Sequence, residues 1–319
     1  MPRVRRGFVV AIFALSSLAA HEALAADPYA IVASAKGRVD VTHGGEARRA
    51  TFGTPLERGD KVTVGAGGAA TVYLSDGNVI ELAERSAVTI GGRVTPAAKI
   101  GPGSDPSAGV YNQVSRFVTG GSRQNGLVAM SAMRGGAETA LIVAPRQSDV
   151  LDDRPSFHWR AAEGATRYRV SISSDAGATW TREVTATELA YPADVPALAR
   201  DADYLWKVEA LGDKGPVREE SSAFRVLSGG IAATVRADLT KIAESTGGPE
   251  TPAAHYLAGS YLSGRGLYDD ATSHFMRLGE LSPESPAPHE ALGNVYRAIG
   301  LTDLAAAEYQ RALELTRSP

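Results

Sequence analysis

Residues 72–82 read VYLSDGNVIEL, two alternating apolar runs on either side of an Asp-Gly pair. An Asp-Gly pair in this setting is the strongest short-range signal for a β-hairpin. A two-residue loop would place Val72 opposite Glu81 and divide the apolar side chains between the two faces. A three-residue loop, Ser75–Gly77, places Val72 opposite Ile80 and keeps the apolar side chains together. We therefore predict a three-residue turn that sets strand register and has no chemistry of its own.

The surrounding segment, residues 28–95, is rich in Val, Thr and Gly, with turn residues at the spacing of an all-β domain. We expect strands at 31–35, 38–43, 61–64, 69–75, 78–83 and 86–91. Four stretches mark the order of its strands and turns: Gly37-Arg38-Val39, Leu56–Val62, Leu74–Asn78 and Ser86–Ile90. In that order the segment resembles the FecR domain, a periplasmic β-rich domain. The resemblance implies signal transfer to a sigma factor, but regulators of that type carry a cytoplasmic helical segment before a membrane span. Only six residues precede the first apolar run here. We therefore expect a FecR-like domain and keep the regulatory role as an alternative.

The N-terminus has the pattern of an export signal. Three arginines precede Gly7–Ala20, an uncharged and mostly apolar run, and Ala23–Ala25 fits a small-x-small cleavage site. We predict a signal peptide at residues 1–25. The alternative is an uncleaved anchor, but a helix of that run would span roughly 21 Å against a hydrocarbon core of ~30 Å. The mature chain is therefore expected to be periplasmic, with secretion as the alternative, and not an integral membrane protein.

Charge and cysteine content narrow the class of protein further. The chain has no cysteine, so no disulfide framework holds its domains. Removing residues 1–25, with three arginines and one glutamate, leaves 30 basic and 35 acidic residues, a net charge of −5. No Lys/Arg cluster occurs in the mature chain, so nucleic acid is not an expected partner.

Residues 96–140 are read as a linker or extension that includes one short helix, and residues 141–228 as a β-sandwich of about seven strands. The sandwich resembles a fibronectin type III domain. Trp159 corresponds to the core tryptophan of the second strand, and Leu198 and Tyr204 match the spacing of that family's tyrosine corner. Residues 173–180 form one Asp-box motif, a hairpin signature that is repeated in sialidase propellers and occurs once here.

Residues 229–319 change to a helical period. Ile231, Val235, Leu239 and Ile242 recur at a helical spacing and predict one amphipathic helix at 231–245, expected to act as an N-terminal cap. Two segments then repeat at an offset of 34: residues 252–285 and 286–319. This period and its glycine and aromatic positions resemble the tetratricopeptide repeat. The resemblance implies that the inner face of each repeat's first helix binds a peptide or protein. On this sequence that partner-binding face carries Tyr256, Ser260, Glu290, Asn294 and Arg297.

The histidines show no metal-ligand or protease spacing, and no nucleophile motif occurs. We therefore expect a non-enzymatic multidomain protein of β plus α class without cofactors. Its expected function is that of a scaffold or adaptor for other envelope proteins. The alternatives are a peptidoglycan or glycan binding module and an envelope signalling component. The last helix is expected to leave parts of Leu304, Ala307 and Leu315 uncovered, where a partner, a second copy or the sandwich could pack.

Overall fold

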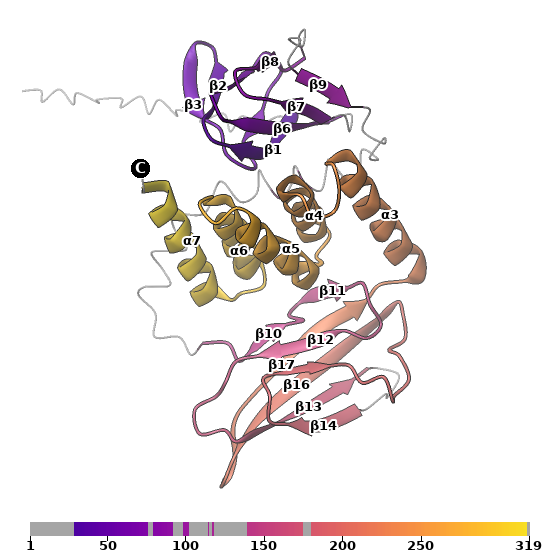
Figure 1. The fold of residues 1–319 in the computed structure, drawn as a ribbon. Helices are drawn as coiled ribbons and strands as arrows, with labels where there is room; N and C mark the ends of the chain where they lie inside the picture. Colours follow the sequence, from indigo (N-terminus) through magenta and orange to yellow (C-terminus); the bar gives the residue numbers. More distant parts are fainter. Residues whose placement is uncertain are drawn as a thin grey trace, which may run out of the picture.

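The computed structural model describes most of the chain after the first 28 residues. The described residues are 29–75, 79–91, 98–101 (backbone only), 114, 117, 139–174 and 180–317. The chain combines β-sheet modules with a C-terminal helical module, as the predicted β plus α fold class requires. The order of the modules in space differs from their order in the sequence, because the helices lie between the two β modules (Figure 1).

The first β module, residues 29–101, consists of two sheets with strand orders β4-β1-β6-β7-β9 and β3-β2-β5-β8. Its strands are β1 (Ala30–Lys36), β2 (Val39–His43), β3 (Glu46–Arg49), β4 (Pro55–Leu56), β5 (Lys61–Val64), β6 (Ala69–Leu74), β7 (Val79–Leu82), β8 (Ala87–Thr89) and β9 (Ala98–Gly101). Val72 pairs with Ile80, which confirms the predicted register. The tip of the turn, residues 76–78, lies outside the described residues. The predicted linker at 96–140 contributes β9, which extends this module beyond its expected end.

The second β module, residues 139–228, packs a three-stranded sheet, β10-β12-β15, against a five-stranded sheet, β11-β17-β16-β13-β14. Its strands are β10 (Ile142–Ala144), β11 (Ser148–Val150), β12 (Ser156–Trp159), β13 (Arg167–Ser173), β14 (Trp180–Val184), β15 (Glu188–Ala190), β16 (Ala202–Gly212) and β17 (Gly215–Val226). Trp159 is buried between the sheets, and the Tyr204 hydroxyl donates to the Ala199 carbonyl at 3.2 Å. The loop of the Asp-box motif, residues 175–179, lies outside the described residues.

The helical module follows directly from β17 and has helices at the predicted positions. They are α3 (Gly229–Ser245), α4 (Pro252–Gly264), α5 (Tyr268–Leu281), α6 (Ala287–Ala298) and α7 (Thr302–Arg317). Thr251 caps α4 by accepting from the Ala254 amide at 3.1 Å. At the equivalent position Ser285 accepts from Ala287 instead, and α6 begins one residue later than the offset predicts.

One prediction for α3 is wrong in detail. Val235 and Ile242 are buried as expected, but Ile231 is exposed, and Ala232 and Asp238 complete the buried face. The buried face of α3 is shifted by one residue at its start, so Ala232 packs inward and Ile231 points to solvent. Buried Asp238 accepts a hydrogen bond from the Tyr261 hydroxyl at 2.7 Å, which ties α3 to α4.

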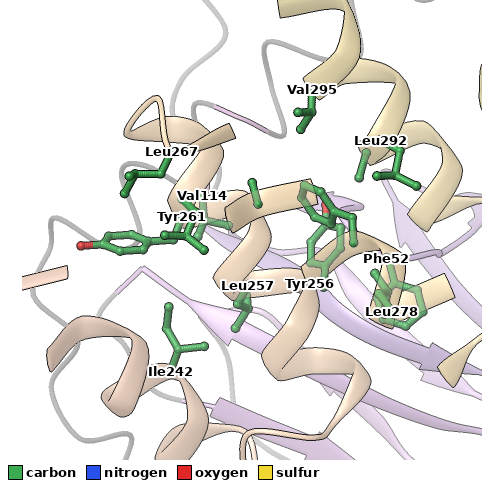
Figure 2. Close-up of a cluster of buried hydrophobic side chains, with 14 of the residues drawn as sticks. Phe52, Val114, Ile242, Tyr256, Leu257, Tyr261, Leu267, Leu278, Leu292 and Val295 are labelled. Atoms are coloured by element: carbon green, nitrogen blue, oxygen red, sulfur yellow. The ribbon is translucent and has the colours of Figure 1, made fainter. Parts of the chain in front are cut away.

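Each β module has a core of its own, and a third hydrophobic core, the shared core, runs through the helical layer and receives side chains from all three modules. Beside the helices, it contains Ile31, Phe52 and Tyr73 of the first β module and Leu151 and Leu227 at the edge of the second. Val114 and Phe117, both in helical conformation in the predicted linker, also pack into it. Figure 2 shows Val114, Tyr261 and Leu267 as members of this cluster, and Phe52 packs against Tyr256 in it. The linker is therefore partly integrated into the core of the molecule.

Candidate functional site

The predicted partner-binding residues come from α4 and α6, the first helices of the two repeats. A glycine allows each of these helices to approach its second helix closely. A Cβ added at Gly259 would lie 2.6 Å from the Phe275 ring, and one at Gly293 would collide with the Tyr309 ring. The two repeats therefore have the same crossing geometry, with the aromatic side chain of the second helix packed against the glycine of the first.

The half of this face that α4 provides is covered by the first β module. Tyr256 is 5% exposed, and its ring lies 5.7 Å from that of Phe52, centroid to centroid. Gly53 has φ +76°, and a Cβ there would collide with the Tyr256 hydroxyl. Burial raises the pKa of Tyr256 well above its ordinary value. Ser260 is fully buried and donates to the Tyr256 carbonyl at 2.8 Å.

The half that α6 provides is more open. Glu290 exposes its side chain, while Asn294 and Arg297 are half-buried. The Tyr309 hydroxyl donates to the Asn294 side-chain oxygen at 2.8 Å, so this asparagine is held in place by α7. Protein around Glu290 removes part of its solvent and raises the pKa of its carboxyl. The structure thus separates the five predicted residues into a covered pair, Tyr256 and Ser260, and an accessible group centred on Glu290.

The fold also brings together two pairs of side chains that the sequence motifs do not reveal, one of two histidines and one of a histidine and a glutamate. The Nδ1 atoms of His255 and His274 lie 3.0 Å apart, and Nδ1 of His289 lies 2.6 Å from Glu308 Oε2. These pairs occupy equivalent positions at the offset of 34, so comparison of the repeats would have found them. Burial lowers the pKa of His274 to about 4, and burial also lowers the pKa of His255. Both imidazoles are therefore neutral near pH 7.

Polar contacts join the second β module to the turns between the two helices of each repeat. Arg160 makes a two-point ion pair with Asp303 at 2.6 and 3.1 Å, at the start of α7. Arg146 donates from Nε to the Ile299 carbonyl, and the Asp149 amide donates to the Gly266 carbonyl at 3.0 Å. Gly266 and Gly300 are equivalent glycines with positive φ, so this module contacts the same turn in both repeats.

The last helix is only partly covered, as the sequence predicts. Leu304 and Leu315 are half-buried and Ala307 is exposed. Leu313, on the same helix, is 51% exposed. Leu304 also packs against the shared core, whose residues come from all three modules.

The described part of the chain contains no group of three or more His, Asp or Glu side chains arranged to hold a metal ion. Among the described helices, none is both long enough and apolar enough to cross a membrane. No protein-family model matches the chain. No curated protein matches its sequence.

Proposed function

We propose that this protein is a non-enzymatic scaffold of the bacterial cell envelope that binds other envelope proteins through its helical module. In this proposal the modules are a FecR-like domain, a fibronectin type III-like sandwich and two tetratricopeptide repeats. The observation that carries it is the shared core, in which the helical module is fixed between the two β modules with half of its inner face open. A rigid body of this kind presents several surfaces at set distances from one another.

Structural details support the proposed module identities. The Tyr204–Ala199 hydrogen bond and buried Trp159 fit the expected features of a fibronectin type III-like sandwich. The glycine–aromatic crossings at Gly259 and Gly293 fit those of tetratricopeptide repeats. Export through residues 1–25, which lie outside the described residues, remains part of the proposal.

The aromatic side chains of the β modules favour protein binding over glycan binding. Glycan recognition by stacking needs exposed rings, whereas the rings here are used in the cores. Tyr73, Trp159 and Trp206 are at most 4% exposed. The half-buried Trp180 ring lies under the Arg182 guanidinium, 5.8 Å from its centroid.

The test is in-cell cross-linking followed by purification of the protein from the periplasm. Deleting residues 229–319 is unsuitable, because it would uncover Ile31, Phe52 and Tyr73 of the first β module. We therefore use Glu290→Arg, which reverses an exposed charge on the open half of the inner face. Glu163→Arg, in an exposed turn of the second β module, is the matched control.

We expect specific partner proteins with the wild type and with Glu163→Arg, and loss of at least one of them with Glu290→Arg. Recovery of no partner above background would refute the scaffold proposal. An identical partner set with all three proteins would show that the inner face does not bind these partners. Co-sedimentation of the wild type with purified cell wall would favour the alternative, a peptidoglycan-binding module.

A further inference from the structure

A groove of about 500 Å³ lies between α3 and α4, away from the predicted site. We call it the α3–α4 groove. Its lining is mainly apolar and includes Leu239, Ile242, Ala254 and Ala258. His274 and Glu244 also line it. Because the pKa of His274 is lowered to about 4, its imidazole adds no charge to the groove near pH 7.

The groove faces away from the predicted partner-binding face. Ala254 and Tyr256 are two positions apart on α4, as are Ala258 and Ser260. Two residues correspond to roughly 200° of rotation about a helix, so each alanine lies on the side of α4 opposite its neighbour on the inner face. Binding at the groove would therefore be independent of binding at Glu290.

Comparison of the two repeats explains why the groove exists. At the offset of 34, Ala254 corresponds to Pro288 and Ala258 corresponds to Leu292. Pro288 and Leu292 are buried, and the Cβ of Pro288 lies 3.7 Å from a Cβ built on Gly279 of α5. The larger side chains thus fill the space between α5 and α6, whereas alanines at the same positions leave space between α3 and α4. The second repeat shows which side chains fit such a space.

The charge at the groove adds a second requirement. Glu244 is exposed, and within the described residues no hydrogen bond or ion pair engages its carboxylate. Lys241, one turn earlier, is 3.6 Å from Asp238 and is directed to that residue. A basic side chain placed beside the apolar groove would meet an uncompensated negative charge, which favours a cationic partner over an anionic one.

We propose that the α3–α4 groove binds a peptide segment of a partner protein that carries two apolar side chains four residues apart and an adjacent lysine or arginine. The apolar pair would take the place that Pro288 and Leu292 take in the second repeat, and the basic side chain would pair with Glu244. This is a second binding surface, separate from the inner face.

The probe is a phage-displayed random peptide library selected against the mature full-length chain, followed by fluorescence anisotropy with the selected peptides in synthetic form. Ala258→Leu fills the groove with the residue found at the equivalent position of the second repeat. Ala298→Leu is its matched control, because Ala298 is an exposed alanine on α6. Glu244→Lys tests the charge, with Glu284→Lys, at another exposed glutamate, as its control.

We expect selected peptides to share the apolar pair and the basic residue, and to bind at least tenfold more weakly to Ala258→Leu and to Glu244→Lys. Both controls and Glu290→Arg should bind as the wild type does, which separates this proposal from the scaffold proposal. Thermal unfolding verifies that each variant folds. Because Glu244 is exposed, its variant still tests the proposal if Ala258→Leu does not fold. The proposal is overturned if no peptide is selected, if the selected peptides bind Ala258→Leu and Glu244→Lys normally, or if only an uncharged acyl detergent competes for the groove.

Discussion

Gly53 is the residue at which the contact between the first β module and the repeats is most sensitive to substitution. Its φ of +76° already disfavours a side chain, and the Tyr256 hydroxyl occupies the space that a Cβ would need. Gly67 has a similar φ of +67° but no atom within 4 Å of an added Cβ, so Gly67→Ala measures the backbone strain alone. We expect Gly53→Ala to lower the free energy of unfolding by about 1–3 kcal/mol more than Gly67→Ala does.

Urea denaturation of both variants checks this prediction. The double variant Gly53→Ala/Tyr256→Phe lacks the colliding oxygen and should recover most of the additional loss. Equal destabilisation by Gly53→Ala and Gly67→Ala would mean that the loop can move away from Tyr256 without cost.

His274 makes stability depend on pH in a defined direction. Its pKa is lowered from 6.5 to about 4, so above about pH 6.5 the neutral form prevails in both the folded and the unfolded chain. As pH falls below 6.5, the unfolded chain binds a proton that the folded chain excludes, and stability is lost. The groups around it are His255, Glu250 and Arg277, with Glu244 lining the same groove.

We expect the unfolding free energy of the wild type, relative to His274→Leu, to fall by about 1–2 kcal/mol between about pH 7.5 and pH 5. Burial raises the pKa of Asp270 to about 7, which acts in the opposite direction but is common to both proteins and cancels in the difference. Urea denaturation at several pH values measures this difference in unfolding free energy between the two proteins. A difference that does not vary with pH would show that His274 has an ordinary pKa.

At the scale of the elements, the same substitution, glycine to alanine, is expected to have opposite effects in α4 and α5. In α4, Gly259→Ala places a Cβ 2.6 Å from the Phe275 ring, which should destabilise the module by about 1–3 kcal/mol. In α5, a Cβ at Gly279 would lie 3.7 Å from Pro288, an ordinary contact, so Gly279→Ala should stabilise by up to about 1 kcal/mol. Thermal unfolding followed by circular dichroism compares them. Stabilisation by both alanines would show that the crossing is loose.

The elements that the sequence predicts are those with strong periodicity. The 34-residue offset locates α4 to α7, and the parity of Val72 and Ile80 predicts their register. The missed strands have little periodicity to detect. All four residues of β3 are exposed, β4 has two residues, and β9 lies in a Pro/Gly-rich segment.

The site could be predicted only in part, because its geometry depends on contacts between distant segments. Repeat positions predict that Glu290, Asn294 and Arg297 share a side of α6, and in the structure Glu290 is exposed while the other two are half-buried. The covering of Tyr256 by Phe52 joins residues that are remote in sequence, and no local pattern encodes it. The α3–α4 groove likewise follows from alanines that look ordinary until they are compared with Pro288 and Leu292.

At the scale of the whole molecule, the helical layer connects two β modules that the sequence places before it. The first β module contacts α4 through apolar side chains. The second contacts the turn of the first repeat through the Asp149 amide, and it contacts the second repeat through Arg146 and Arg160. Because one core runs through these contacts, unfolding of one module removes buried surface from its neighbour. We therefore expect one cooperative thermal transition, with a calorimetric enthalpy equal to the van't Hoff enthalpy.

Phe52→Ala should divide that transition. Phe52 is 6% exposed and lies at the contact with Tyr256, while the separate core of the first β module, around Val41 and Val72, does not include it. Its removal is expected to cost about 3 kcal/mol, mostly from the coupling between modules. Differential scanning calorimetry should then show two transitions, the lower one from the detached module. Val72→Ala, inside that separate core, should lower stability without uncoupling the helices in the same way. A single transition in Phe52→Ala, with unchanged enthalpy ratio, would mean that Ile31 and Tyr73 are sufficient to hold the first β module on the helices, and that the contact between Phe52 and Tyr256 is secondary.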